Sequence, residues 1–246
     1  MKRFLTIAMI FAIPLVLVAT PAMAQKYNPA INAPQKPFNT LTAKEKADGW
    51  KLLFDGETLK GWDRDENHPG EWSVTSDGII YSAKGATHLF SAKKYKDIDL
   101  SWDVCAYDVG VPDVDDPMAS PRMGNSGVFV RGVKSGTSFP KGYEVQVDPY
   151  DLNNPTGGVY GKCPGTFLVK DGKWKPEAFF QIHEGKWMHQ RVRIEGNRLQ
   201  IWVNGEKTMD WTDKEKSFPE AGYIALQNHH KTDVVLFTNI KVKVLD

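Results

Sequence analysis

The sequence predicts an all-β protein, an antiparallel sandwich or barrel with one short helix near its N-terminus. Apolar and polar residues alternate in several short segments, most clearly from Ile98 to Tyr107. Such alternation places one side of a strand in a core and the other side outside it. Turn signals separate these segments, and no long stretch repeats apolar residues at the helical period. Short strands joined by frequent turns are typical of sandwiches and barrels.

Five more segments show strand character, at residues 72–74, 79–81, 143–148, 199–203 and 240–244. Ser76-Asp77-Gly78 marks a turn between the first two. Asn204-Gly205 follows the fourth and is a strong hairpin signal, because these residues tolerate positive φ.

The expected helix lies at the entry to the domain. Thr42 and Glu45 have the spacing of a capping box, and Gly49 follows a few helix-compatible residues. We therefore expect one short helix just before the first strands.

The first residues have the features of a secretory signal peptide. Lys2 and Arg3 precede an apolar run of about 15 residues, and the sequence PAMA at 21–24 supplies an A-x-A cleavage pattern. A spanning helix needs roughly 20 apolar residues. We expect residues 1–24 to be removed and the chain to be exported, periplasmic or secreted, with an uncleaved membrane anchor as the alternative.

After cleavage the chain would begin at Gln25. Residues 25–40 are expected to form an extended leader because prolines interrupt small polar residues, and residues 41–246 to form one domain. Loss of Lys2 and Arg3 would leave 29 of the 31 basic residues against 30 acidic ones. A balance so near zero, without a basic cluster, argues against nucleic acid or an anionic membrane as partner.

Cys105 and Cys163 are the only cysteines. An oxidising compartment permits a disulfide between them, but the distance between two thiols depends on the fold. The sequence is compatible with a disulfide and with two reduced thiols.

The sharpest polar feature is the segment that carries Glu144, Gln146 and Asp148. Alternate residues of a strand share a face, so these side chains line up at intervals of roughly 6.6 Å. A polar face of this kind can simply meet solvent, or it can line a site.

Two other segments can join this face. Arg131 is expected to project with Phe129, on the face opposite to the neighbouring valines. A cation there can pair with Glu144 or hold a developing oxyanion. Gln227 and His229 share a face by the same rule, and His229 is either a structural histidine or a general acid or base.

The sequence requires no cofactor, since it has no H-E-x-x-H, C-x-x-C, P-loop, G-x-S-x-G or dinucleotide-binding motif. A divalent metal such as calcium is compatible with the carboxylates of Asp113, Asp115 and Asp116, although they lack EF-hand spacing and can equally form a solvated acidic loop. Eight Trp and eight Tyr residues offer ring faces that suit the CH-rich face of a pyranose.

Seven motifs follow one another along the chain: WKLLFDG at 50–56, LKGW at 59–62, NSGVFVR at 125–131, GYEVQVD at 142–148, TGGVY at 156–160, WVNG at 202–205 and GYIALQNH at 222–229. In this order they resemble the 3-keto-disaccharide hydrolase domain family, over roughly residues 41–245. The ordered set is far more specific than any single motif.

The resemblance implies a concanavalin A-like jelly-roll sandwich of two antiparallel sheets with a concave, sugar-facing side. It also implies cleavage of glycosides already oxidised at the 3-hydroxyl. Elimination across C1–C2 followed by hydration would achieve this. Such a saccharide substrate implies a sugar 3-oxidoreductase as functional partner.

On this hypothesis His229 is the base, Arg131 or a bound metal stabilises the enolate, and Glu144 is the acid. The roles of His229 and Glu144 can be exchanged. The residues expected to orient the sugar hydroxyls are Gln146, Asp148, Asn125, Tyr160 and Gln227.

Two other functions are compatible with the same fold. A conventional jelly-roll glycoside hydrolase of the retaining type needs two carboxyl groups about 5–5.5 Å apart, for which residues 144–148 offer only Glu-x-Gln-x-Asp. A non-catalytic carbohydrate-binding module can use this sandwich too, but it has no need of a titrating base.

Overall fold

The computed structural model describes residues 34, 36–83, 87–108, 124–135, 140–148, 150–182 and 186–245. The expected signal peptide and most of the expected leader lie outside this part of the chain. Among the described residues, no helix has the length and apolar character needed to cross a membrane.

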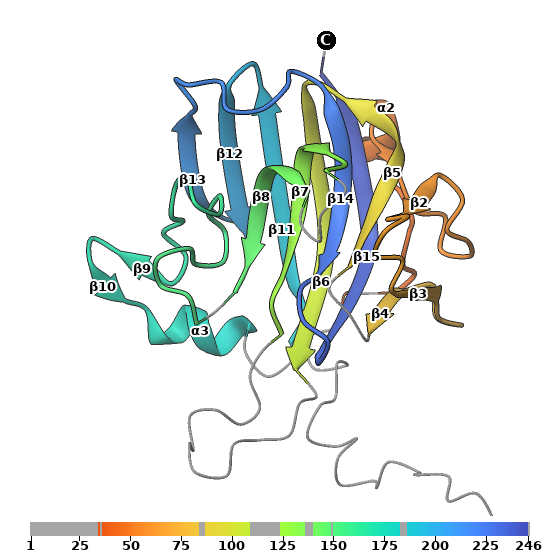
Figure 1. Cartoon of the computed structure of the whole chain (residues 1–246), viewed down its shortest axis with the longest axis horizontal. Coiled ribbons are helices and arrows are strands. Elements are labelled where there is room, and N and C mark those ends of the chain that lie inside the picture. Colours follow the sequence, from red (N-terminus) through yellow and green to blue (C-terminus); the bar gives the residue numbers. More distant parts are fainter. Residues whose placement is uncertain are drawn as a thin grey trace, which may run out of the picture.

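Two antiparallel sheets lie one behind the other and form a sandwich (Figure 1). The larger sheet has the order β13-β12-β11-β6-β15-β4-β3, and β1 pairs with β15. Its strands are β1 (Lys51–Leu52), β3 (Glu71–Val74), β4 (Ile80–Ala83), β6 (Ile98–Asp108), β11 (Met188–Glu195), β12 (Arg198–Val203), β13 (Glu206–Thr212) and β15 (Asp233–Val244).

The smaller sheet has the order β2-β5-β14-β7-β8. Its strands are β2 (Trp62–Arg64), β5 (Thr87–Tyr95), β7 (Ser126–Val133), β8 (Lys141–Val147) and β14 (Gly222–Asn228). The three neighbours β14, β7 and β8 matter most below, because strands far apart in the sequence bring their side chains together here. This architecture confirms the expected all-β jelly-roll sandwich of two antiparallel sheets.

Two local expectations are confirmed. Helix α2 (Ala43–Ala47) begins at a complete capping box, in which the Glu45 backbone N–H donates to Thr42 Oγ1 at 3.1 Å and Glu45 Oε2 accepts from the Thr42 N–H at 2.7 Å. Asn204 and Gly205 have φ of 48° and 84° and join β12 to β13 as a hairpin. Positive φ at both positions is what a tight hairpin turn requires.

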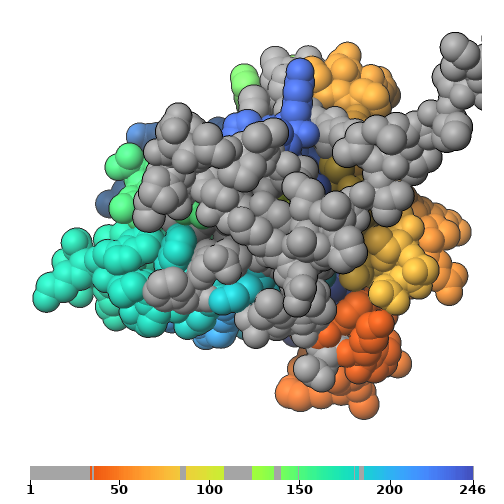
Figure 2. All heavy atoms as spheres, turned by 90° about the horizontal axis from the view of Figure 1, so that it is seen from below, coloured from red at the N-terminus to blue at the C-terminus, as the bar shows by residue number. Residues whose placement is uncertain are grey.

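The structure has a second helix that the sequence analysis did not predict. Helix α3 (Pro176–Ile182) follows a small hairpin of β9 (Val169–Lys170) and β10 (Lys173–Trp174). Pro176 occupies its first position, and Ala178 and Ile182 are buried one turn apart. Seven residues are too few for this pattern to stand out in the sequence. Figure 2 shows this region, in blue-green, projecting at one side of the molecule.

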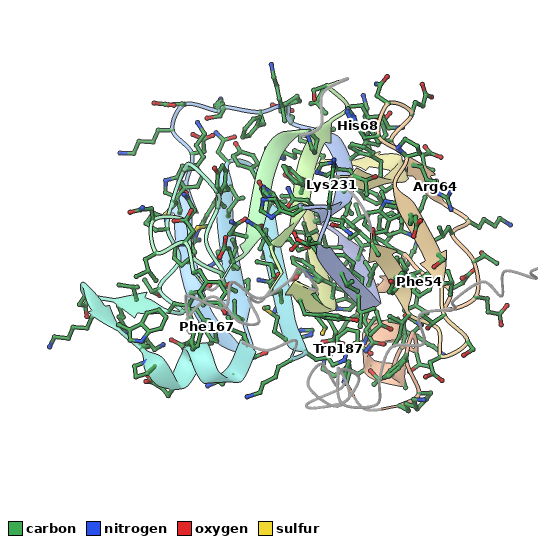
Figure 3. The ribbon with its side chains drawn as sticks, turned by 60° about the horizontal axis from the view of Figure 1, so that its bottom comes forward. Phe54, Arg64, His68, Phe167, Trp187 and Lys231 are labelled. Carbon is green, nitrogen blue, oxygen red and sulfur yellow. The ribbon has the colours of Figure 1, made fainter. Side chains whose placement is uncertain are left out.

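The core lies between the sheets and follows the alternation of the strands. Leu199, Ile201 and Val203 of β12 are fully buried, as alternate residues of one face. Phe54 and Phe167, labelled in Figure 3, belong to the same core on opposite sides of the view. Each large apolar side chain buried in this way contributes about 1.5–3 kcal/mol to folding.

The two cysteines do not form a disulfide. Cys105 is buried on β6, whereas Cys163 is half-buried in the segment after β8, and both are thiols. Stability therefore comes from the packed core rather than from a covalent link.

Candidate active site

A pocket of about 520 Å³ opens on the smaller sheet. Its lining includes six of the eight residues expected at the site: Asn125, Glu144, Gln146, Tyr160, Gln227 and His229. They come from β8, β14 and the segments beside them, and β7 lies between these two strands in the sheet. The alternation of the strands therefore assigned Glu144, Gln146, Gln227 and His229 to the face on which the pocket opens.

Glu144 reaches the pocket across a glycine. Gly127 lies on the neighbouring β7, and a Cβ atom there would meet Oε1 of Glu144 at 2.5 Å. The bare backbone of Gly127 is what lets the carboxyl group occupy this place. Burial raises the pKa of Glu144 to about 8, because a charged carboxylate loses its hydration there. At neutral pH the group is a carboxylic acid, able to donate a proton.

Amide groups with unused hydrogen-bonding capacity surround this acid. Gln227 and Gln146 are buried residues, 1% and 2% exposed. Both polar atoms of the Gln227 amide, Oε1 of Gln146 and Oδ1 of Asn125 have no hydrogen-bond partner within the described residues. Gln227 lies close enough to Glu144 to lower the pKa of that acid, without meeting hydrogen-bond geometry. A buried polar group left unpaired costs about 1–3 kcal/mol, so these atoms are suited to a polar ligand.

His229 stands at the end of β14, two residues beyond Gln227 and on the same face. Burial, and then the neighbouring His230, lower the pKa of His229 to about 4. The imidazole is therefore neutral at neutral pH and can accept a proton. Nδ1 of His229 lies 3.0 Å from Nε2 of His230.

Arg131 was expected to project with Phe129 onto the face that carries the site, and this prediction is wrong. The pairing of β7 with β8 shifts between Val130 and Val133, and Arg131 has φ of 54°. This bulge breaks the period-two alternation and turns the side chain away from Phe129. The guanidinium is buried and donates from Nη2 to Asp97 Oδ1 at 2.8 Å and to the Gly196 carbonyl at 2.5 Å. Arg131 ties two turns of the sandwich together and does not line the pocket.

Asp148 does not line the pocket either, because it lies just beyond the end of β8. Its Oδ2 accepts a hydrogen bond from Asn125 Nδ2 at 3.0 Å, and its Oδ1 accepts from the backbone N–H groups of Tyr150 and Asp151 at 2.8 and 3.1 Å. Burial raises the pKa of Asp148. The carboxylate orders Asn125 and the loop after β8 rather than meeting a ligand itself.

Several residues of the site were missed by the sequence analysis. Lys141, Asp151 and Phe218 also line the pocket. His88 of β5 is not in the pocket lining but is opposite Gln227 in the strand register; it is fully buried, with its ring 5.6 Å from the ring of Phe129. Burial lowers the pKa of His88 to about 4. Residues 87–90 do not alternate polar with apolar side chains, so no sequence pattern marks His88.

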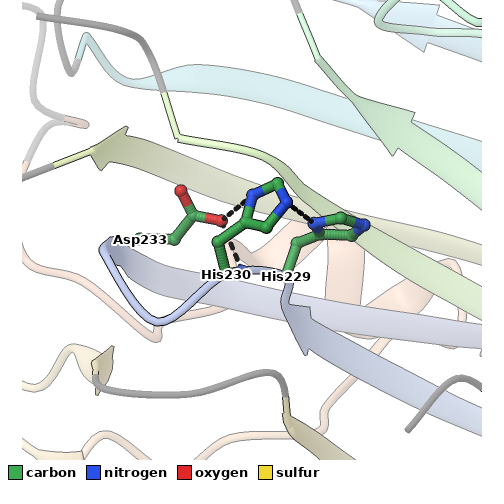
Figure 4. Close-up of side chains that lie close together, drawn as sticks. All are labelled: His229, His230 and Asp233. Atoms are coloured by element: carbon green, nitrogen blue, oxygen red, sulfur yellow. Dashed lines mark hydrogen bonds and ion pairs between the residues drawn. The ribbon is translucent and has the colours of Figure 1, made fainter. Parts of the chain in front are cut away.

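One group of potential metal ligands is compact among the described residues: His229, His230 and Asp233, whose ligand atoms lie within 4.8 Å of one another. In Figure 4, His230 stands between the other two and presents a different ring nitrogen to each. Each residue needs to offer only one ligand atom, so these three side chains could hold a metal ion. The carboxylates that were considered as possible calcium ligands lie outside the described part of the chain: Asp113, Asp115 and Asp116.

A polar pocket with an acid and an imidazole thus opens on one face of a jelly-roll sandwich, and the family match and the relative given next support a carbohydrate-active function. The chain belongs to the 3-keto-α-glucoside-1,2-lyase-like domain family, whose model matches residues 49–243. A 3-keto-disaccharide hydrolase of Bacteroides thetaiotaomicron is 22% identical over 91% of this chain and 87% of that protein.

Solved structures agree with the fold. The crystal structure of a candidate glycosyl hydrolase from Parabacteroides distasonis has a TM-score of 0.59 and 22% identity, covering 85% of this chain and 100% of that one. A second structure of the same description and organism has a TM-score of 0.52 and 24% identity, covering 80% and 84%. At such identities the likeness concerns the fold alone.

Proposed function

We propose that this chain is a glycoside-cleaving enzyme that acts on sugars already oxidised to a ketone at C3. Cleavage proceeds by β-elimination across C1–C2, followed by addition of water. Membership of the family supports this substrate class, as does the name of the Bacteroides relative. The observation that carries the proposal is that one pocket holds a carboxylic acid and an imidazole that are both neutral at neutral pH.

The chemistry follows from the acidity that a C3 ketone gives to the hydrogen on C2. His229 takes this proton, and the C–H electron pair forms the C2–C3 enolate. The enolate then restores the ketone as a C1–C2 double bond forms and the bond from C1 to the leaving oxygen breaks. Glu144 gives its proton to that oxygen. Water adds at C1 with its proton passing to Glu144, and His229 returns a proton to C2, so the net change is hydrolysis.

The two pKa shifts separate roles that the sequence left exchangeable. A pKa of about 4 makes His229 a neutral acceptor at neutral pH, and a pKa of about 8 keeps Glu144 protonated as a donor. Environments that push two titratable groups in opposite directions are typical of acid–base pairs. We therefore assign His229 as the base and Glu144 as the acid.

We assign stabilisation of the enolate oxygen to Gln227, because Arg131 lies outside the pocket. The Gln227 amide is buried and has no hydrogen-bond partner within the described residues. A donor already aimed at a developing negative charge in a water-poor site is worth about 3–4 kcal/mol to the transition state. The residues left to orient the sugar hydroxyls are Gln146, Asn125 and Tyr160, with Asp148 acting through Asn125.

Two observations favour the proposal over the alternative functions. Within residues 144–148 only one carboxyl group, that of Glu144, lines the pocket, since Asp148 is engaged with Asn125 and two backbone N–H groups. The paired carboxylates of a retaining hydrolase are therefore not supplied by this segment. Asp151 is a second carboxyl group in the pocket lining, but it accepts hydrogen bonds from the backbone N–H groups of Asn153 and Asn154 and from the Asn154 side chain. A binding module has no need of a neutral acid beside a neutral base.

The substrate class has consequences for partners and location. A sugar 3-oxidoreductase must introduce the ketone before cleavage, and we propose such an enzyme as the functional partner. We also propose that the chain is exported, to the periplasm or beyond. The steps written above use no metal ion.

The test compares a 3-keto-glucoside with the unoxidised glucoside. We expect release of the aglycone from the ketone alone, and a decrease in kcat of about 10²- to 10⁴-fold in Glu144→Gln. Glu177→Gln, an exposed acid on α3, is the control and should match the wild type. Turnover of the unoxidised glucoside would favour an ordinary glycosidase, and binding without turnover of either would favour a binding module.

A further inference from the structure

Three residues at the junction of β14 and β15 form a chain of contacts that ends in the pocket (Figure 4). Nδ1 of His229 lies 3.0 Å from Nε2 of His230, and Nδ1 of His230 lies 3.4 Å from Oδ2 of Asp233. The same Asp233 oxygen accepts the backbone N–H of His230 at 2.7 Å. Asp233 is 1% exposed at its side chain, so its carboxylate is a fixed and buried end of the chain.

One arrangement of protons fits these contacts. An ionised carboxylate can only accept hydrogen bonds, so an Asp233 oxygen 3.4 Å away favours the tautomer in which Nδ1 of His230 carries the hydrogen. Nε2 of a neutral His230 is then an acceptor, and the hydrogen between the two histidines belongs to Nδ1 of His229. The remaining nitrogen of His229, Nε2, carries a lone pair.

We propose that Asp233 and His230 are positioning residues that hold His229 in the tautomer able to take the C2 proton. This inference rests on the proposed function. When Nε2 of His229 accepts the proton, the C–H electron pair remains on the sugar as the enolate. Nδ1 of His229 keeps its hydrogen bond to His230, whose Nδ1–H points to the Asp233 carboxylate. The positive charge thus forms on His229, and the Asp233 carboxylate at the other end of the contacts stabilises it. No proton passes from His229 to His230 or Asp233.

The exposure of His230 favours this role over a purely structural one. Its side chain is 60% exposed, and exposed ion pairs contribute only about 0–1 kcal/mol to stability. Removing the His230 ring should therefore leave the fold intact. The same exposure makes His230 a better test than Asp233, whose replacement disturbs a buried turn.

The experiment uses His230→Ala and Asp233→Asn, with Lys231→Ala, an exposed neighbour, as the matched control. In ¹⁵N NMR of the free protein at neutral pH, we expect His229 to carry its hydrogen on Nδ1 in the wild type and in Lys231→Ala. In His230→Ala the population should move toward the Nε2–H tautomer. His229 found as the Nε2–H tautomer in the wild type would overturn the proposal without any reference to activity.

The kinetic readout uses a 3-keto-glucoside with deuterium at C2. In His230→Ala we expect kcat to fall about 10- to 100-fold with KM little changed, less than the roughly 10²- to 10⁴-fold loss of the base itself. The isotope effect on kcat should rise, because removal of the C2 proton becomes slower than other steps. Unchanged kcat, or a loss that raises KM with no change in isotope effect, would overturn the positioning role.

Two further outcomes separate the hypotheses. A wild type that is inactive on 3-keto-glycosides but shows the expected tautomers would contradict the proposed function while supporting the hydrogen-bonded chain. Activity abolished by a chelator and restored by a divalent metal alone, with the His230 variant no longer responding, would instead make these residues metal ligands and overturn the proposal.

Discussion

Arg131 and Gln227 are both buried polar side chains on the smaller sheet, yet they do opposite things. The guanidinium of Arg131 is satisfied by Asp97 and by the carbonyl of Gly196. The amide of Gln227 lines a pocket and has no hydrogen-bond partner within the described residues. The first arrangement supports the fold at one end of the sandwich, and the second leaves polar atoms for a ligand. Hydrogen-bond satisfaction, rather than charge or burial, distinguishes the two regions.

Replacing each of these two residues by methionine tests whether Arg131 serves the fold and Gln227 serves the ligand. Arg131→Met leaves the Asp97 carboxylate without its cation, and removing one partner of a buried ion pair costs about 3 kcal/mol. We expect the free energy of unfolding, measured with urea, to fall by this amount while kcat per folded molecule stays at the wild-type value. A fall in kcat without loss of stability would return Arg131 to the catalytic site.

Gln227→Met should give the opposite result. Methionine has a similar volume and no hydrogen-bonding amide, so the free energy of unfolding should stay the same or rise slightly. The enolate loses its donor, and we expect kcat to fall by about 10²- to 10³-fold. Steady-state kinetics on a 3-keto-glucoside, paired with urea unfolding, measures both quantities. Destabilisation with unchanged kcat would show that this amide serves the fold, as Arg131 does.

A smaller effect concerns the pH range of activity. His229 must be unprotonated, so kcat should fall about tenfold per pH unit below the pKa of about 4. Glu144 must be protonated, so kcat should also fall above a pKa of about 8. In Glu144→Gln the decrease above pH 8 should vanish from the residual activity. A decrease on the alkaline side that persists in this variant would assign it to another group.

Period-two alternation predicted much of the site, because it holds wherever a strand is regular. It placed Glu144 with Gln146, and Gln227 with His229, on the face that carries the pocket. It failed at Arg131, where a bulge with positive φ at a non-glycine residue inserts one position into the strand. No pattern in the sequence predicts such a bulge.

Other parts of the site depend on tertiary contacts. Asp148 lies where the strand has ended, so its carboxylate turns to Asn125 and the following loop. The contact between His230 and Asp233 depends on the turn between β14 and β15. Sequence spacing alone does not determine which ring nitrogen of a histidine faces which neighbour.

The central claim is that the Glu144–His229 pocket cleaves a 3-keto-glycoside through removal of the C2 proton. Cleavage in D₂O tests it most directly, with the released 3-keto sugar examined by mass spectrometry and NMR as soon as it forms. The elimination route exchanges the C2 hydrogen, so we expect one deuterium at C2 in the wild type and a greatly slowed reaction in His229→Ala. Release of the aglycone with the original hydrogen retained at C2 would contradict the claim, because direct displacement at C1 never breaks that bond.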